Sequence, residues 1–99
     1  MAKRERLSEQ QIAAALAGLS GWSVSNGKLR REYRFSDFIH AFGFMATAAI
    51  AIENMNHHPE WCNVYNRVTV ELVTHDAGGI TQNDVELART LEALANRPA

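Results

Sequence analysis

The sequence of 99 residues contains little of what marks several large classes of protein. Its one cysteine, Cys62, cannot form an internal disulfide, which indicates a reducing compartment such as the cytoplasm. Ten basic and eleven acidic residues give a formal net charge of −1, without the basic excess of an autonomous nucleic-acid-binding domain. The basic start of the chain runs into polar residues and lacks the apolar stretch of a signal peptide. We therefore expect a cytoplasmic protein that binds no nucleic acid.

A hydrophobic run long enough to cross a membrane is also missing. The most apolar stretch, 38–52, contains no charged residue when His40 is counted as neutral, but it is shorter than the roughly 17–25 apolar residues of a spanning helix. We therefore expect no membrane partner. A helix here is apolar on nearly all sides, which is typical of burial on more than one face. Since a chain this short buries only about 60–70% of its unfolded surface, we expect a homodimer or homotetramer formed through helix 38–55.

Hydrophobic residues make up 46% of the chain and charged residues 21%, which is the composition of an ordinary globular protein. The length suits one domain, and no repeat, low-complexity tract or Pro- or Ser-rich linker divides the sequence. We therefore expect a single domain spanning residues 1–99.

The first third of the sequence predicts a helix followed by a hairpin. Ser8 and Gln11 have the spacing of a capping box, and the helix that they begin should stop within 18–21, which starts and ends with glycine. Asn26-Gly27 is the strongest short hairpin signal in the chain. In the run 28–35, Leu29, Arg31, Tyr33 and Phe35 alternate with four charged residues, which predicts a strand with the charged set towards water.

Ser36 is the expected N-cap of the long apolar helix. That helix should end near Asn56 or His57, because Pro59 biases the residue before it towards extended geometry. The region between the first hairpin and this proline is therefore expected to be helical over most of its length.

The last third predicts a second hairpin and a last helix. Strands are expected at 61–65 and 68–73, with a tight turn near Asn66-Arg67. Thr81, with Asp84 three residues later, is the expected cap of the last helix. The order of elements is then α-β-β-α-β-β-α. This order predicts an α+β fold, a four-stranded and mainly antiparallel sheet with three helices packed on one face.

Three of the four histidines lie where elements end, which is where a rigid scaffold can direct side chains into a shared cleft. His57 and His58 follow the long helix, and His75 follows a strand. Histidine titrates near neutrality, so it can donate or accept a proton in catalysis. The dipole of the helix favours protonated His57 by about 0.3–1 kcal/mol. Glu53 lies four residues earlier and is predicted to orient His57 or hold its charge.

These residues resemble a family signature. Glu53-x-x-x-His57-His58-Pro59 followed by Tyr65, His75 and Asp84 is similar to the signature of the pterin-4a-carbinolamine dehydratase family. The supporting words are His58-Pro59-Glu60-Trp61, Asn63-Val64-Tyr65-Asn66, Thr74-His75 and Gly78-Gly79-Ile80-Thr81. The resemblance covers about residues 19–94, which is nearly the whole domain.

The resemblance implies the dehydration of a 4a-hydroxytetrahydropterin to a quinonoid dihydropterin, which recycles the pterin of aromatic amino acid hydroxylases. It implies three catalytic histidines: His57 and His75 as proton donors and His58 as a residue that helps to hold the substrate. No cofactor is implied, because the pterin is the substrate. Glu53, Trp61 and Asp84 are the expected supporting or substrate-binding residues.

Several alternatives stay open at this point. Trp61 could form a wall of the pterin pocket or pack in the core, and Asp84 could belong to a catalytic network or only cap a helix. Three histidines could instead bind zinc, although adjacent residues at a helix end diverge, so no metal is expected. The family also includes dimerisation cofactors of a transcription factor, so the chain could be a protein-binding module. A dehydratase-like protein serving another pterin pathway is a further alternative.

Overall fold

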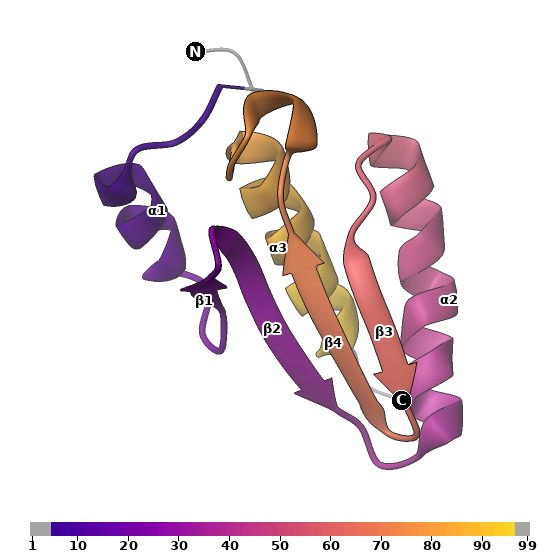
Figure 1. Ribbon diagram of the computed structural model, residues 1–99. Coiled ribbons are helices and arrows are strands. Elements are labelled where there is room, and N and C mark those ends of the chain that lie inside the picture. Colours follow the sequence, from indigo (N-terminus) through magenta and orange to yellow (C-terminus); the bar gives the residue numbers. More distant parts are fainter. Residues whose placement is uncertain (1–4, 97–99) are drawn as a thin grey trace.

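The computed structural model describes residues 5–96, which form one four-stranded antiparallel sheet with three helices on one of its faces (Figure 1). This confirms the predicted α+β fold and order of elements. The elements are α1 (Glu9–Leu16), β1 (Ser23–Ser25), β2 (Lys28–Arg34), α2 (Phe38–Met55), β3 (Glu60–Val64), β4 (Arg67–Leu72), the short 3₁₀ helix η1 (His75–Ala77) and α3 (Gln82–Ala95).

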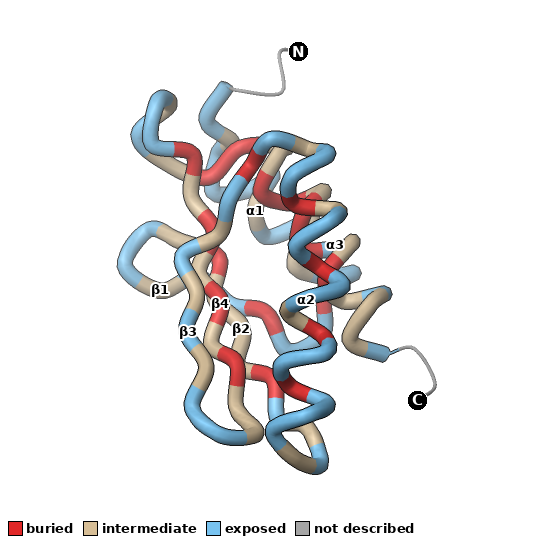
Figure 2. The backbone as a smooth tube through the Cα atoms, turned by 90° about the vertical axis from the view of Figure 1, so that its right-hand side faces the viewer, coloured by how far each residue is buried: buried red, intermediate tan, exposed pale blue. Residues whose placement is uncertain are grey.

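The two hairpins lie side by side in the sheet, whose strand order is β1-β2-β4-β3. The central strands β2 and β4 are antiparallel, with Leu29 opposite Leu72 and Tyr33 opposite Val68. Figure 2 shows the helices on one side of this sheet and the other face left open. The second hairpin therefore brings the end of β4 close to the end of α2, which is where the predicted histidines lie.

The turns show what the sequence predicts correctly and where it is off by one residue. Asn26 and Gly27 both have positive φ, 53° and 75°, as a two-residue type I′ turn requires. The second turn was expected near Asn66-Arg67, but β4 already begins at Arg67. The turn is made by Tyr65 and Asn66, with Tyr65 in the left-handed region at φ 52°. Tyrosine is uncommon in that region, so this turn carries no strong sequence signal.

The core lies between the sheet and α2 and α3. The buried side chains of β2 and β4 alternate along each strand, as a half-solvated antiparallel sheet requires. The last helix covers them with one apolar stripe and is capped as predicted by a reciprocal capping box between Thr81 and Asp84. The buried hydrophobic residues of these three elements are Leu29, Tyr33, Val68, Val70, Leu72, Val85, Leu87, Ala88 and Leu91.

The long helix begins one residue later than expected. Its N-cap is Asp37 and not Ser36, because the Asp37 carboxylate accepts a hydrogen bond from the His40 backbone N–H at 2.9 Å. The helix ends at Met55, as predicted, but the immediate cause is Asn56, which adopts the left-handed conformation at φ 51°. Pro59 lies beyond this stop.

Within the chain, α2 buries one face and not several. Its buried residues are Ala41, Phe44, Ala48 and Ile52. Phe38, Ile39, Phe42 and Ile50 are exposed, the last to 67%. The helix has 18 residues and a mean hydropathy of 1.3, so by length and composition it is the one helix in residues 5–96 that could cross a membrane. The expectation that the apolar run is too short to do so therefore holds for 38–52 but not for the whole helix.

Candidate active site

The three predicted histidines lie along one open cleft of 230 Å³ between the end of α2 and the end of β4. His57 and His58 come from the turn after α2, and His75 begins the 3₁₀ helix η1 after β4. The residues that line the cleft are Asn56, His57, His58, Val73, Thr74, His75 and Asp76. Hairpin β3–β4 is the reason for this convergence, because it returns the chain to the level of the α2 C-terminus.

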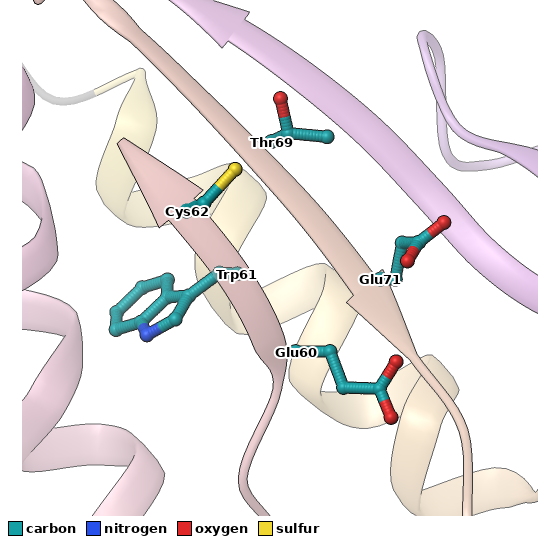
Figure 3. Close-up of a pocket in the computed structure, with 5 residues that line it drawn as sticks. All are labelled: Glu60, Trp61, Cys62, Thr69 and Glu71. Atoms are coloured by element: carbon teal, nitrogen blue, oxygen red, sulfur yellow. The ribbon is translucent and has the colours of Figure 1, made fainter. Parts of the chain in front are cut away.

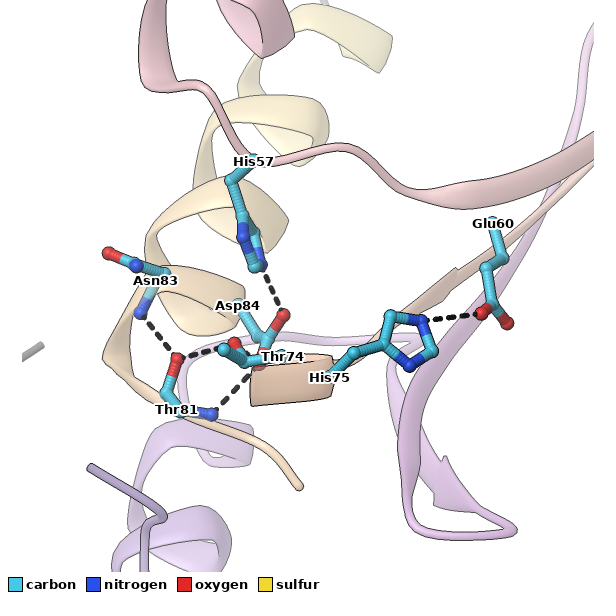
Figure 4. Close-up of polar contacts among 7 residues, drawn as sticks. All are labelled: His57, Glu60, Thr74, His75, Thr81, Asn83 and Asp84. Atoms are coloured by element: carbon cyan, nitrogen blue, oxygen red, sulfur yellow. Dashed lines mark hydrogen bonds and ion pairs between the residues drawn. The ribbon is translucent and has the colours of Figure 1, made fainter. Parts of the chain in front are cut away.

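The imidazole of His57 is buried and held by Asp84. Its Nε2 lies 2.5 Å from Oδ1 of Asp84, which is fully buried at the start of α3 (Figure 4). The other oxygen of Asp84 accepts hydrogen bonds from the Thr74 hydroxyl at 2.9 Å and the Thr81 backbone N–H at 2.8 Å. Asp84 therefore belongs to the capping box of α3 and also holds His57, so it does more than cap a helix. An ionised carboxylate only accepts, so Nε2 carries the hydrogen.

Glu53 contacts His58 and not His57, which corrects the sequence expectation. Its carboxylate oxygen Oε1 lies 3.0 Å from His58 Nε2, and both side chains are exposed. The rule that residues four apart face each other holds only inside a helix. Asn56 leaves the helix in the left-handed conformation, so His57 turns inwards to Asp84 and the next residue returns to Glu53.

Sequence reasoning missed Glu60, the first residue of β3. Its Oε2 lies 3.0 Å from His75 Nε2, and Figure 4 shows the ring of His75 directed towards it and away from His57. Its other oxygen Oε1 lies 2.5 Å from Nζ of Lys28 on β2. The hydrogen bond from Lys28 lowers the pKa of the Glu60 carboxyl, with a smaller contribution from His75. Residues 28, 60 and 75 are far apart in sequence, so only the sheet reveals this contact.

All three cleft histidines share one arrangement, in which Nε2 meets a carboxylate. The carboxylate partners differ in burial: that of His57 is buried and those of His58 and His75 are exposed. A carboxylate on one nitrogen fixes the tautomer and orientation of the ring. The pairs are His57–Asp84, His58–Glu53 and His75–Glu60. The cleft can therefore present several oriented proton donors or acceptors to one ligand.

Trp61 does not line the cleft of the histidines. It lies opposite Val70 in the sheet, and Figure 3 shows its ring on the side of α2, where it packs against the core. Of the two alternatives, this placement favours packing over a wall of the ligand pocket. A second cleft of 230 Å³ shares no lining residue with the first and is lined by Glu60, Trp61, Cys62, Thr69 and Glu71.

The geometry gives no support to a zinc centre. Among residues 5–96, no group of three or more His, Cys, Asp or Glu side chains is placed to hold a metal ion. The ring of His75 points towards β3, and that of His57 points towards α3 (Figure 4). Rings that diverge in this way do not converge on one tetrahedral centre.

Comparisons with known proteins point to the family that the sequence resembles. The family model described as pterin 4 alpha carbinolamine dehydratase matches residues 5–94. A protein of Solibacter usitatus, provisionally named a pterin-4-alpha-carbinolamine dehydratase, is 64% identical over 90 residues, which are 91% of this chain and 95% of that protein. A Rhizobium etli protein with the same provisional name is 53% identical over 97 residues, or 96% of each chain.

Solved structures share the fold. The crystal structure of a transcriptional coactivator/pterin dehydratase from Brucella melitensis superposes with a TM-score of 0.89 at 46% identity, over 93% of this chain and all of that chain. A pterin dehydratase-like RuBisCO assembly factor of the alpha-carboxysome has a TM-score of 0.63 at 18% identity, over 78% of this chain and 89% of that one, which indicates a common fold alone. The family model and the relatives together confirm the resemblance seen in the sequence: this chain belongs to the pterin-4-alpha-carbinolamine dehydratase family.

Proposed function

We propose that this protein dehydrates a 4a-hydroxytetrahydropterin to the quinonoid dihydropterin by histidine acid–base catalysis. The observation that carries the proposal is the cleft shared by His57, His58 and His75, in which each ring is oriented by a carboxylate. Membership of the dehydratase family supports the choice of a pterin as the substrate.

The proposed reaction needs proton transfer and no electron transfer. The C4a–O bond breaks with its electron pair on oxygen, and that oxygen takes a proton and leaves as water. N5 loses its proton, and the electrons of the N5–H bond form the C4a=N5 double bond. An acid and a base beside one flat ring are sufficient, and each typically contributes about 10²–10⁴-fold. No further cofactor is required, because the pterin is itself the substrate.

The proposed donors are His57 and His75, with His58 holding the substrate and assisting. His57 is buried beside Asp84, so its ring is the most rigidly held of the three. His58 and His75 are exposed at the mouth of the cleft, where a ligand can reach them. A flat pterin ring that lies between the end of α2 and the start of η1 can meet one donor from each, His57 and His75. This is the arrangement that the family resemblance implies.

A stopped-flow assay tests this proposal directly. The 4a-hydroxytetrahydropterin is generated by an aromatic amino acid hydroxylase, and its breakdown is followed by absorbance with and without this protein in the presence of a chelator. We expect acceleration by the wild-type protein that chelation does not reduce. An unchanged rate of breakdown would refute the proposal, and loss of activity on chelation would favour the zinc alternative. Comparing biopterin with other tetrahydropterins in the same assay identifies the preferred substrate.

The exposed apolar face of α2 supports a second proposal, self-association of the chain as a homodimer or homotetramer. Phe38, Ile39, Phe42 and Ile50 are exposed, although isolated chains rarely leave so many large apolar side chains in water on one helix. The same face would suit a foreign helix. A role as a protein-binding module is therefore the alternative, and the Brucella melitensis relative is described as a coactivator as well as a dehydratase. A pull-down that recovers only copies of this chain would favour self-association.

A further inference from the structure

His75 differs from His57 in the exposure of its ring and of the carboxylate that the ring meets. Its side chain is 75% exposed, and it begins a single turn of 3₁₀ helix. A proton donor must keep its reacting nitrogen within hydrogen-bond distance of the substrate, so an exposed ring needs a partner that restricts its rotation. The side chain placed to do so is Glu60, whose Oε2 lies 3.0 Å from Nε2 of His75.

Glu60 is held in turn by a residue from a third strand. Lys28, the first residue of β2, reaches across the open face of the sheet and places Nζ 2.5 Å from Oε1 of Glu60. The hydrogen bond from Lys28 keeps the pKa of Glu60 below its ordinary value, so the carboxylate is ionised wherever histidine titrates. Lys28, Glu60 and His75 thus form a chain of contacts that joins β2, β3 and η1.

Other charged groups surround this chain of contacts. Glu71 on β4 lies directly opposite Glu60 in the sheet register, and Arg30 on β2 lies 3.9 Å from Glu71. Asp76 follows His75 and lines the same cleft. The pKa of Lys28 is raised, first by its hydrogen bond to Glu60 and also by the charges of Glu60 and Glu71, so Lys28 stays cationic. Among these groups, Glu60 places its carboxylate oxygen 3.0 Å from Nε2 of His75.

We infer that Glu60 is a positioning residue for His75 in the dehydration, with Lys28 fixing the carboxylate. By accepting the hydrogen on Nε2, Glu60 leaves Nδ1 of His75 as the nitrogen that faces the substrate. This inference rests on the proposed function. It gives a role to Glu60, a residue that does not contact the pterin.

Stability offers no competing reason for this arrangement. The side chains of His75 and Glu60 are 75% and 42% exposed, and ion pairs between exposed groups contribute little to folding. The chain also offers a matched control. Glu32 and Arg34 form an ion pair at 3.0 Å on β2, with side chains 32% and 64% exposed, and neither lines the histidine cleft. Glu32→Gln therefore removes the same charge from a comparable pair outside the site.

The test compares the wild-type protein with Glu60→Gln, Lys28→Met, Lys28→Arg and Glu32→Gln. For Glu60→Gln we expect kcat to fall about tenfold with KM changed less than about twofold, a part of what a general acid contributes. Lys28→Met should lower kcat by a smaller factor, about threefold, and Lys28→Arg should restore it, because the cation is then kept. Glu32→Gln should match the wild type in kcat, KM and unfolding midpoint.

A second readout needs no substrate. The ¹⁵N chemical shifts of the histidine rings report which nitrogen carries the hydrogen in the neutral form, and we expect Nε2–H for His75 in the wild type. In Glu60→Gln, Lys28 donates to the amide oxygen, so the amide NH₂ faces His75 and the ring hydrogen moves to Nδ1. Glu32→Gln should leave the tautomer unchanged.

The outcomes separate this inference from the proposed function. If the wild-type protein does not accelerate carbinolamine breakdown, the proposed function is wrong, and the tautomer of His75 alone decides whether Glu60 orients the ring. If the wild-type protein is active, a wild-type kcat in Glu60→Gln overturns the inference. An unchanged His75 tautomer in that variant overturns it equally.

Discussion

Oδ1 of Asp84 lies 2.5 Å from Nε2 of His57, so the residue that caps α3 also holds the histidine at the end of α2. The second oxygen of the same carboxylate accepts hydrogen bonds from Thr74 and Thr81. Three segments of the chain therefore meet on one buried side chain. The contacts of Asp84 therefore both position the cleft and stabilise the fold.

Replacing Asp84 with alanine should destabilise the protein by about 2–4 kcal/mol. The change removes half of the capping box, leaves the buried Nε2 of His57 without its partner, and removes one of the two hydrogen bonds of the Thr74 hydroxyl. Urea unfolding followed by circular dichroism measures the loss. Arg89→Ala, at an exposed position of the same helix, should stay within about 0.5 kcal/mol of the wild type. Equal stability of the two variants would show that Asp84 does not join the segments energetically.

Replacing His57 or His75 with alanine should lower the rate of carbinolamine dehydration at least about tenfold, because each variant loses a proposed proton donor. Stopped-flow absorbance measures the rate, and circular dichroism verifies that each variant is folded. His40→Ala is the control, since His40 lies in the first turn of α2 and meets Asp37 instead of the cleft. Wild-type rates in both the His57 and His75 variants would remove the assignment of donors.

Placing a charge on the exposed face of α2, as in Ile50→Glu, should dissociate the proposed oligomer. A carboxylate forced into an apolar interface has no partner there and is costly to bury. Sedimentation or size-exclusion chromatography measures the size of the particle. Ala14→Glu adds the same charge to an exposed position of α1 and should leave the size unchanged. If Ile50→Glu keeps the size of the wild-type oligomer, the interface lies on another surface.

Glu92 should make the stability of the fold depend on pH in the acid range. Burial opposes the ionisation of this carboxyl, but hydrogen bonds from Tyr33, Trp22 and Asn96 outweigh burial and lower its pKa. A carboxyl with a lowered folded pKa stabilises the fold above its unfolded pKa, near 4.5, and loses that contribution as the pH falls through the folded value.

Glu92→Gln should therefore be about 1 kcal/mol less stable than the wild type at pH 7, and the difference should shrink as the pH falls below 4.5. Urea unfolding at a series of pH values measures both stabilities. Glu9→Gln, at an exposed position in the first turn of α1, is the matched control. A Glu92→Gln difference that stays constant with pH would contradict the assigned shift.

Much of the local structure could be predicted because its causes are local. The capping boxes at Ser8 and Thr81 and the Asn26-Gly27 turn each depend on residues no more than three apart, and all are observed. Where two neighbouring residues are both suitable N-caps, the sequence predicts the wrong one. Ser36 and Asp37 are both good N-caps, and only the geometry of the first turn shows that Asp37 caps α2.

The partners of the histidines could not be predicted in the same way. Helical spacing predicts a contact between Glu53 and His57. The left-handed Asn56 ends the helix before His57, so that spacing does not apply. Glu60 stands in the sequence only as part of the word His58-Pro59-Glu60-Trp61, and its contacts with Lys28 and His75 could not be predicted because they cross the sheet.

By itself the sequence determined which segments are helices and strands and which histidines stand at their ends, since hydrophobic period, caps and turn residues act over a few positions. Only the tertiary structure decided which carboxylate meets which ring. Sheet register and the packing of α3 against α2 bring together Asp84 and His57, 27 residues apart, and Glu60 and His75, 15 residues apart. Contacts over such separations form only when the whole core is in place, because burial of the core offsets the entropy of closing those loops.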